Sequence, residues 1–206
     1  MNLLSDLQYF PPISSIKSSY HFSHIIFEQY DIYPKASFRN RLMIANANGK
    51  VTLSIPIAGG RTQRKCYKDI RIDNRINWKN NHWKNLESAY NRSPWFSFYH
   101  DELKSLYERS FGFLIDWNLA CFDWLIASIG LEQIRISCTD EFRDSYDPAI
   151  FTDLRQSLLP SNYDQFSIPK YHQVFEEKLG FLSNLSILDL IFCEGPGARE
   201  LLKTVN

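Results

Sequence analysis

Residues 33–57 read YPKASFRNRLMIANANGKVTLSIPI, and their alternation decides the predicted fold class. From Val51 to Ile57 every second residue is apolar, which is the pattern of a half-buried strand. Leu42 and Ile44 form a shorter alternating run, and Asn48-Gly49 supplies residues that favour the positive φ angles of a type I′ turn. The stretch therefore predicts an antiparallel hairpin that is entered directly from Arg39.

The triplet Arg39-Asn40-Arg41 places two guanidinium groups and an amide at the root of this hairpin. Guanidinium groups bind carboxylates and phosphates through paired hydrogen bonds. One interpretation is a clamp for an anionic group of a substrate. The other is a set of structural ion pairs or strand caps, because ion pairs at protein surfaces are common and weak. The triplet by itself leaves both interpretations open.

Strand patterns recur on both sides of the hairpin. Phe22 to Glu28 is a nearly continuous apolar run that ends in a carboxylate, which is typical of interior strands in α/β sheets. Asp69 to Asp73 alternates, and Gln133 to Thr139 follows a helical segment that ends at Gly130. Each of the three segments is predicted to be a strand, and the helix-then-strand order indicates an α/β sheet.

Helical spacing replaces alternation in the middle of the chain. Trp83, Leu86 and Tyr90 recur at helical intervals, which predicts a helix over residues 80–92. Ser93-Pro94 is a typical pair for the N-cap and first helical position, so a second helix is predicted to begin there.

Residues 111–129 are apolar enough to suggest a membrane span. Asp116 and Asp123 argue against it, because a carboxylate at the middle of a bilayer costs about 2.5 kcal/mol or more. The segment is therefore predicted to be a helix buried on most sides, with no membrane insertion. From Asp140 to Pro169 the chain shows no sustained periodicity, and one short helix is predicted near residues 151–158.

These patterns together predict a single α/β domain over residues 1–206. It has a mixed sheet with an N-terminal β-rich portion that includes the hairpin, then a central aromatic-rich helical portion, and finally a C-terminal strand and helices. The formal net charge is zero, which gives no reason to expect nucleic acid as a partner. The amino terminus lacks the features of a signal peptide, so a cytoplasmic location is predicted.

The four cysteines predict neither a disulfide framework nor a metal site. Cys66, Cys121, Cys138 and Cys193 are scattered and show no C-x-x-C spacing. Thiols in such a pattern are expected to be reduced and mostly buried. No cofactor is indicated by any other motif. The glycines and basic residues from Ala58 to Lys68, Arg61 among them, are compatible with a cradle for phosphate and with an ordinary solvated loop, and they match no specific phosphate-binding motif.

With these residues in view, the chain resembles the bacterial WbqC-like family. The resemblance rests on the order and spacing of several short motifs along most of the chain. They are Tyr9-Phe10-Pro11-Pro12-Ile13, Lys35 with Ser37 to Arg41, Asn48-Gly49, Asp69, Trp78, His82-Trp83, Ala89-Tyr90, Ser93-Pro94, Tyr171, Gln173, Asn184 to Leu190 and Glu194-Gly195.

The resemblance implies a transferase in the biosynthesis of surface polysaccharides, including the O-antigen of lipopolysaccharide. The substrate would be a nucleotide-activated or lipid-linked sugar, and the transferred group an aminoacyl, particularly glycyl, group. Other glycan-assembly enzymes would be its protein partners. Near its start the chain departs from many relatives, because Ser14-Ser15-Ile16-Lys17 stands where they carry a glycine and aromatic residues. This departure points to a different substrate if the loop binds one.

Catalytic and binding roles follow as predictions under this hypothesis. His82 would act as the general base, and Asp189 or Glu28 would orient it. The predicted substrate-binding residues are Lys35, Arg39, Asn40, Arg41, Trp78, Trp83, Tyr90 and Ser186. The alternative hypothesis is a non-catalytic glycan- or nucleotide-binding scaffold, because the sequence has no catalytic triad. A third architecture, a nucleotidyltransferase-like Rossmann variant, fits the order of the first elements but lacks the paired-histidine H-x-G-H signature.

Overall fold

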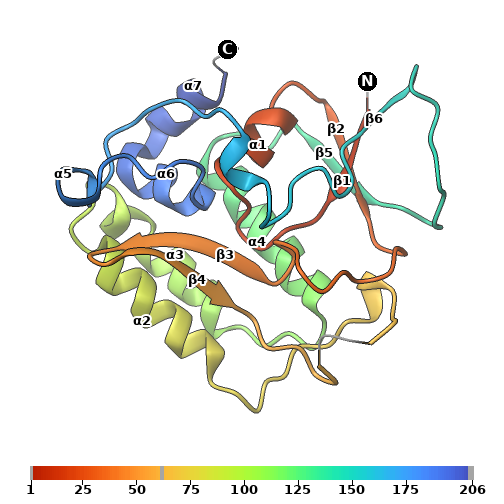
Figure 1. Ribbon diagram of the computed structural model, residues 1–206, viewed down its shortest axis with the longest axis horizontal. Coiled ribbons are helices and arrows are strands. Elements are labelled where there is room, and N and C mark those ends of the chain that lie inside the picture. The colour runs from red at the N-terminus through yellow and green to blue at the C-terminus, as the bar shows by residue number, and fades with distance from the viewer. Residues whose placement is uncertain (1, 61–62, 204–206) are drawn as a thin grey trace.

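The computed structural model describes residues 2–60 and 63–203 and has an α/β architecture (Figure 1). Its strands and helices follow one another along the chain as β1 (Asn2–Asp6), α1 (Ile13–Ser19), β2 (His24–Glu28), β3 (Arg41–Asn46), β4 (Gly49–Ser54), α2 (Trp78–Tyr90), α3 (Phe96–Glu108), α4 (Leu114–Ser128), β5 (Arg135–Cys138), β6 (Phe151–Asp153), α5 (Glu176–Leu179), α6 (Ile187–Glu194) and α7 (Ala198–Lys203). The α/β class, the hairpin, the aromatic-rich central helices and the C-terminal helices predicted from the sequence are confirmed.

Parallel and antiparallel strands lie in separate sheets. The larger sheet has four parallel strands in the order β5-β2-β1-β6. The chain first winds outward from β1 through β2 to β5 and then returns to the other side of β1. The order therefore reverses between β1 and β6, which is the topological switch point where open α/β sheets commonly bind ligands.

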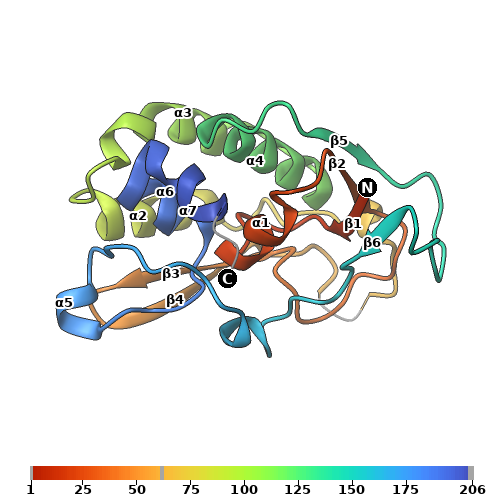
Figure 2. The ribbon, with the colours of Figure 1, turned by 90° about the horizontal axis from the view of Figure 1, so that it is seen from above.

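The two faces of this sheet are covered differently. Ile25 and Phe27 face the helices, and the rings of Phe27 and Phe122 of α4 meet edge to face at 4.9 Å. Ile26 and Ser137 are register partners and point to the opposite face. The segment 139–150, which joins β5 to β6, runs outside that face as an irregular chain without a helix (Figures 1 and 2).

The hairpin β3–β4 forms its own sheet, with Leu42 paired to Leu53 and Asn46 paired to Gly49. This register makes Ala47 and Asn48 the two turn residues, so the predicted turn centred on Asn48-Gly49 is wrong by one position. Asn48 has a negative φ angle, and its N–H donates to Oδ1 of Asn46 at 2.8 Å. The positive φ of 123° falls on Gly49 alone within this turn.

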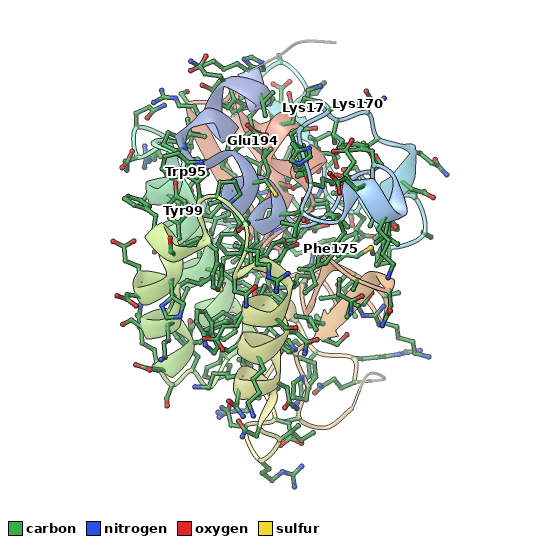
Figure 3. All side chains as sticks on the ribbon, turned by 90° about the vertical axis from the view of Figure 1, so that its left-hand side faces the viewer. Lys17, Trp95, Tyr99, Lys170, Phe175 and Glu194 are labelled. Carbon is green, nitrogen blue, oxygen red and sulfur yellow. The ribbon has the colours of Figure 1, made fainter. Side chains whose placement is uncertain are left out.

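Helices α2, α3, α4 and α6 surround a core rich in aromatic rings. Helix α6 is buried on all sides from Ile187 to Cys193, as expected for a helix that is apolar around its whole circumference. The start of α3 lies against the end of α6, where the Trp95 N–H donates to the Phe192 carbonyl at 3.0 Å. Figure 3 labels Trp95 and Glu194, the last residue of α6. None of the described helices combines the length and apolar character that crossing a bilayer requires.

Three local predictions are corrected by the structure. Residues 69–73 were predicted to be a strand, but Asp69 ends a short 3-10 helix (Tyr67–Asp69) and the residues after it make two isolated bridges, Ile57 to Ile72 and Arg71 to Phe113. Helix α3 begins at Phe96 with Trp95 as its N-cap residue, two positions after the predicted Ser93-Pro94 start.

The third correction concerns residues 151–158, which were predicted to be a short helix. Phe151 to Asp153 instead form β6, whose pairing with Asn2 to Leu4 of β1 supplies the hydrogen bonds that the local sequence does not specify. The segment thereby completes the parallel sheet.

Candidate functional site

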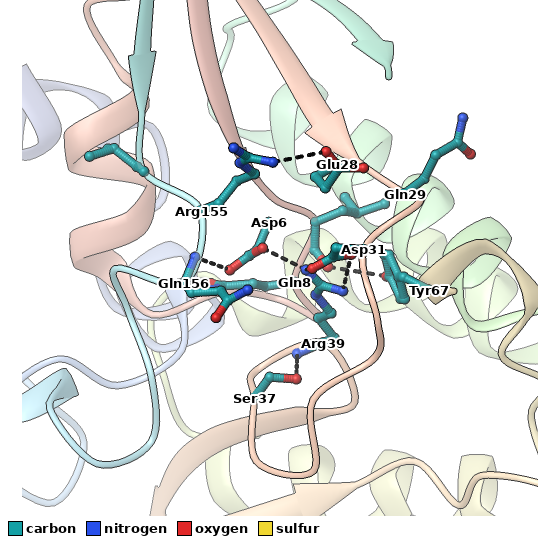
Figure 4. Close-up of polar contacts among 12 residues, drawn as sticks. Asp6, Gln8, Glu28, Gln29, Asp31, Ser37, Arg39, Tyr67, Arg155 and Gln156 are labelled. Carbon is teal, nitrogen blue, oxygen red and sulfur yellow. Dashed lines mark hydrogen bonds and ion pairs between the residues drawn. The ribbon is translucent and has the colours of Figure 1, made fainter. Parts of the chain in front are cut away.

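Polar side chains stand at the carboxyl ends of all four parallel strands. Asp6 ends β1 and Glu28 ends β2, and the two are register partners. Thr139 follows β5 directly, and Asp153 ends β6. These four residues and the side chains bound to them form one group, which we call the strand-end cluster. Figure 4 labels Asp6, Glu28, Asp31, Arg39 and Arg155 of this group. Its members are Asp6, Glu28, Asp31, Arg39, Thr139, Asp153 and Arg155.

Arg39 is the centre of one half of the cluster. It is fully buried, and its guanidinium group binds Asp31 through two hydrogen bonds of 2.8 and 2.6 Å and Asp6 through one of 2.6 Å. Its Cζ lies 4.6 Å from the centre of the Tyr67 ring. Burial alone would lower the pKa of Arg39, but the two carboxylates outweigh it and raise the pKa overall. Arg39 is therefore a permanent buried cation.

Arg155 organises the other half. Its guanidinium group binds Glu28 at 3.2 Å and Asp153 at 2.7 Å, and it also donates to the carbonyl oxygens of Arg143 and Asp144. Glu28 is fully buried and accepts a second hydrogen bond, 2.9 Å long, from the hydroxyl of Thr139. Burial would raise the pKa of Asp153, but its hydrogen bonds with Arg155 lower it overall.

A hollow of about 240 Å³ lies between the outer sheet face and the segment 139–150, and Thr139 is the cluster member that lines it. We call it the strand-end hollow. Its lining residues are Ile26, Ser137, Cys138, Thr139, Asp140, Glu141, Arg143, Tyr146 and Phe151. Burial and the charge of Glu28 raise the pKa of the Cys138 thiol, so this cysteine stays protonated at neutral pH. By contrast, the hollow at the switch point beside Ser5 and Leu154 measures only about 20 Å³, room for little more than a water molecule.

His82 belongs to a separate, buried chain of hydrogen bonds. Its Nε2 faces the carbonyl oxygen of Ser54 at 3.3 Å, so Nε2 carries the proton and Nδ1 accepts from the Tyr9 hydroxyl at 3.0 Å. Tyr9 in turn accepts from the hydroxyl of Tyr107. Burial lowers the pKa of His82 to about 4, although the Ser54 carbonyl opposes this. The imidazole is therefore neutral and fully engaged within the protein.

Asp189 lies in a third network, between α6 and the chain around Tyr171. It is 1% exposed and accepts hydrogen bonds from Tyr90 at 2.7 Å, Tyr171 at 2.5 Å and Gln173 at 3.3 Å. Burial raises the pKa of Asp189, and these donors oppose the shift. In the described structure neither Asp189 nor Glu28 contacts His82, so the predicted orientation of His82 by either carboxylate is not present.

The other predicted residues are distributed over several elements. Asn40 donates to the carbonyl of Ile55 at 2.9 Å inside the hairpin, and Ser186 caps α6 and donates to the carbonyl of Phe10. Arg41 lies at the surface, where it donates to the carbonyl of Lys35 at 3.3 Å. The structure thus brings Arg41 together with Lys35, and separates both from the guanidinium of Arg39.

The aromatic predictions fall close to His82. The ring of Trp78 meets that of His82 at 5.1 Å, and Trp83 packs on Phe96 and Tyr107. Trp83 also borders a surface hollow of about 330 Å³ whose other lining residues include Lys79 and Lys104. The binding roles predicted for these residues stay predictions. Of the basic loop from Ala58 to Lys68, residues 61 and 62, including Arg61, lie outside the described residues.

Sequence reasoning missed most of the strand-end cluster. Glu28 was noticed as a carboxylate that ends an apolar run, and Asp6 follows Leu3-Leu4 in a shorter run of the same kind. Asp31 and Arg155 of the cluster, and Tyr146 in the lining of the hollow, stand in segments without periodicity, so no local signal distinguishes them.

The comparison with known families adds an independent finding. A family model described as the WbqC-like protein family matches residues 8–158, which is more than half of the chain. The chain belongs to the WbqC-like protein family. The match includes the hairpin, α2 and most of the strand-end cluster, and it leaves out the motifs from Tyr171 to Gly195. Membership suggests a role in polysaccharide-related processes. No curated protein and no solved structure matches the chain.

Proposed function

We propose that this WbqC-like protein is a transferase of surface-polysaccharide biosynthesis, including that of the O-antigen, that modifies a nucleotide-activated or lipid-linked sugar at the strand-end cluster. The observation that carries the proposal is the convergence of polar groups from four adjacent strand ends beside a hollow of about 240 Å³. In open α/β sheets, ligands bind outside the carboxyl ends of the strands. Family membership supports the polysaccharide context.

The geometry favours the strand ends over the surroundings of His82 as the place of reaction. Both ring nitrogens of His82 already bind protein groups, and its pKa of about 4 makes it a weak base at neutral pH. The strand-end hollow, in contrast, opens to the surface and is bordered by hydroxyl, carboxylate and guanidinium groups. Transfer of an aminoacyl group, particularly glycyl, to a sugar held there is the form of the reaction that we propose.

Thermal-shift measurements with a panel of nucleotide-sugars at millimolar concentration test the proposal. At least one compound should raise the melting temperature, because a ligand that binds only the folded state stabilises it. The rise should disappear in Ser137→Trp, which fills the hollow, and persist in Phe98→Ala, an exposed ring on α3. A panel that leaves the melting temperature unchanged would refute the proposal.

A non-catalytic glycan- or nucleotide-binding scaffold is the second candidate function. It is favoured by one observation: Arg39, His82 and Asp189 occupy three separate buried networks and do not meet in one cavity. Mass spectrometry of the sugar after incubation with protein, nucleotide-sugar and an aminoacyl donor separates the two functions. A sugar that gains an aminoacyl group supports the transferase, whereas binding without any product supports the scaffold.

A further inference from the structure

The strand-end hollow lies on the face of the parallel sheet that the segment 139–150, without a helix in the described structure, runs across. Parallel sheets are almost always covered on both faces. Here α4 packs on the face of Phe27, while on the opposite face Ile26 lines the hollow together with residues of the segment 139–150. Both views of the ribbon place this segment at the outer edge of the molecule, away from the helices (Figures 1 and 2). On this outer face Leu4 is fully buried, whereas its register partner Ile26 is only partly buried and lines the hollow, so a ligand can reach the sheet at Ile26 and Ser137.

The apolar part of the hollow has the shape of a wall and a floor. The rings of Tyr146 and Phe151 lie 5.0 Å apart at 58° and form the wall, and Ile26 contributes to the floor. Pyranose rings present C–H groups that pack against such aromatic surfaces, as other amphipathic rings do. Phe142 and Ile150, each about half exposed, extend the apolar character of the segment around the hollow.

The charges around the hollow oppose the binding of phosphate. Asp140 and Glu141 line it with their carboxylates, and Arg143, the one cation among its lining residues, is paired with Glu141 at 2.6 Å. Behind them, the guanidinium group of Arg155 is engaged by Glu28 and Asp153. An anionic group would therefore meet guanidinium groups that already have carboxylate partners, together with additional negative charge.

The hollow does, in contrast, present acceptors for the hydrogen-bond donors of a ligand. The carboxylate of Asp140 has no hydrogen-bond or ion-pair partner among the described residues. The hydroxyl oxygen of Ser137 contacts His24, and that of Thr139 donates to Glu28 and accepts from the Gln29 N–H at 3.3 Å, so each oxygen keeps capacity for one more acceptor contact. Sugar hydroxyl groups and ammonium groups are donors of this kind, and an ammonium group gains further from the negative surroundings.

We propose that the strand-end hollow binds the ring of a neutral or amino sugar, with any phosphate or nucleotide of the substrate kept outside it. This inference rests on the proposed function and specifies which part of the substrate the site holds. The ring packs against Tyr146 and Phe151, and its hydroxyl or ammonium groups donate to Asp140 and its neighbours. The hollow beside Lys79 and Lys104, lined by cations and by Trp83, is the competing place for a sugar phosphate.

Amide chemical-shift mapping on the full-length protein tests the inference with glucose, glucosamine and glucose 1-phosphate as probes. Glucose and glucosamine should shift the amide signals of residues 137–151, and glucosamine should bind about tenfold more tightly than glucose 1-phosphate, a difference typical of one favourable and one unfavourable charge contact. Asp140→Asn should remove most of the preference for glucosamine. Asp101→Asn, a carboxylate whose side chain is 97% exposed on α3, serves as its matched control.

Two further variants test the aromatic wall. Tyr146→Leu should weaken all sugar binding severalfold, whereas Phe98→Ala, which removes a 69% exposed ring elsewhere, should not. If Tyr146→Leu fails to fold, the chemical-shift changes that sugars cause in the wild-type protein decide whether residues 137–151 bind them. Glucose 1-phosphate that binds the strand-end hollow as tightly as glucosamine would overturn the inference and leave the proposed function standing. Sugars that instead shift signals around Trp83 and Lys104 would overturn both the inference and the placement of the reaction at the strand ends. The absence of binding by all sugars and all nucleotide-sugars would overturn the inference and the proposed function together.

Discussion

Carboxylates at the carboxyl end of the parallel sheet are neutralised by guanidinium groups, whereas Asp189, buried just as deeply, is met by neutral donors in the described structure. Asp6 and Asp31 share Arg39, and Glu28 and Asp153 share Arg155. Asp189 receives hydrogen bonds from two tyrosine hydroxyls and one amide. The first arrangement contains full charges that interact electrostatically with a bound ligand. The second is an internal hydrogen-bonded contact between α6 and the chain around Tyr171.

The difference separates residues that hold the fold together from residues that can respond to a ligand. Around Asp189 and His82 every partner is internal, and both side chains are at most 4% exposed. The strand-end cluster is also buried at Arg39, but Thr139, which donates to Glu28, lines the hollow on the outer sheet face. Substitutions in the three places should therefore differ in magnitude and in dependence on pH.

Breaking the charged network should have the largest effect. Arg39→Met leaves the buried carboxylates of Asp6 and Asp31 without their cation, so the free energy of unfolding should fall by about 3–5 kcal/mol. Arg41→Met removes a guanidinium only two residues away that makes one surface contact, and should cost less than about 1 kcal/mol. Urea unfolding monitored by circular dichroism measures both. Equal losses in the two variants would show that Arg39 is not the structural centre of the cluster.

The contrast between Arg39 and Arg41 also shows the limit of sequence reasoning. The period-two pattern placed the hairpin correctly, and helical spacing placed α2 and α4 to within a few residues, because each signal is local. The inward turn of Arg39 depends on Asp6 and Asp31, which lie on other elements. The three-residue strand β6 likewise depends on its pairing with β1, so neither it nor the strand-end cluster could be predicted from the sequence alone.

Titration of His82 should produce the next largest effect. Its pKa of about 4 in the folded protein lies below the ordinary value of 6.5, so the unfolded chain binds the proton more tightly between these values. Stability should therefore be lost as the pH falls from about 6.5 to about 4, by about 2.5 kcal/mol at pH 4.5. His82→Gln should lack this share of the pH dependence. His172→Gln, at a position where the side chain is 80% exposed, should retain it.

Urea unfolding of wild type and both variants at pH 7.5 and 4.5 measures this difference. The titration of the carboxylates contributes equally to the pH dependence of stability in all three proteins and cancels in the comparison. An identical loss of stability in the wild type and His82→Gln on acidification would contradict the placement of a neutral imidazole between Tyr9 and Ser54.

Removing one neutral donor from Asp189 should have a smaller effect that grows with pH. Tyr90→Phe deletes a 2.7 Å hydrogen bond to the carboxylate and should cost about 1.5–3 kcal/mol at neutral pH. The pKa of Asp189 is raised, so the folded state favours its protonated carboxyl. The contribution of this carboxyl to stability is therefore present below the pKa of the unfolded state and is lost as the pH rises through the pKa of the folded state. The cost of Tyr90→Phe should therefore be smaller near pH 4 than at pH 7.

Tyr163→Phe is the matched control, because its hydroxyl binds the exposed Lys50 amine and no buried carboxylate. It should change stability by less than about 0.5 kcal/mol at both pH values. A cost of Tyr90→Phe that rises on acidification would mean that the Tyr90 hydroxyl stabilises the protonated carboxyl of Asp189 and does not donate to the carboxylate.

The exposed side of the segment 139–150, next to the strand-end hollow, should contribute least to stability. Phe142 is 49% exposed, and its ring lies 5.7 Å from the Cζ atom of Arg155. Phe142→Ser should therefore change the free energy of unfolding by no more than about 0.5 kcal/mol in urea titrations. A loss of 2 kcal/mol or more, on the order of burying a whole aromatic side chain, would mean that the segment 139–150 closes over the sheet as part of the core. In that event a ligand could reach Ile26 and Ser137 only after the segment opened, and the separation between a structural interior and a responsive strand end would fail.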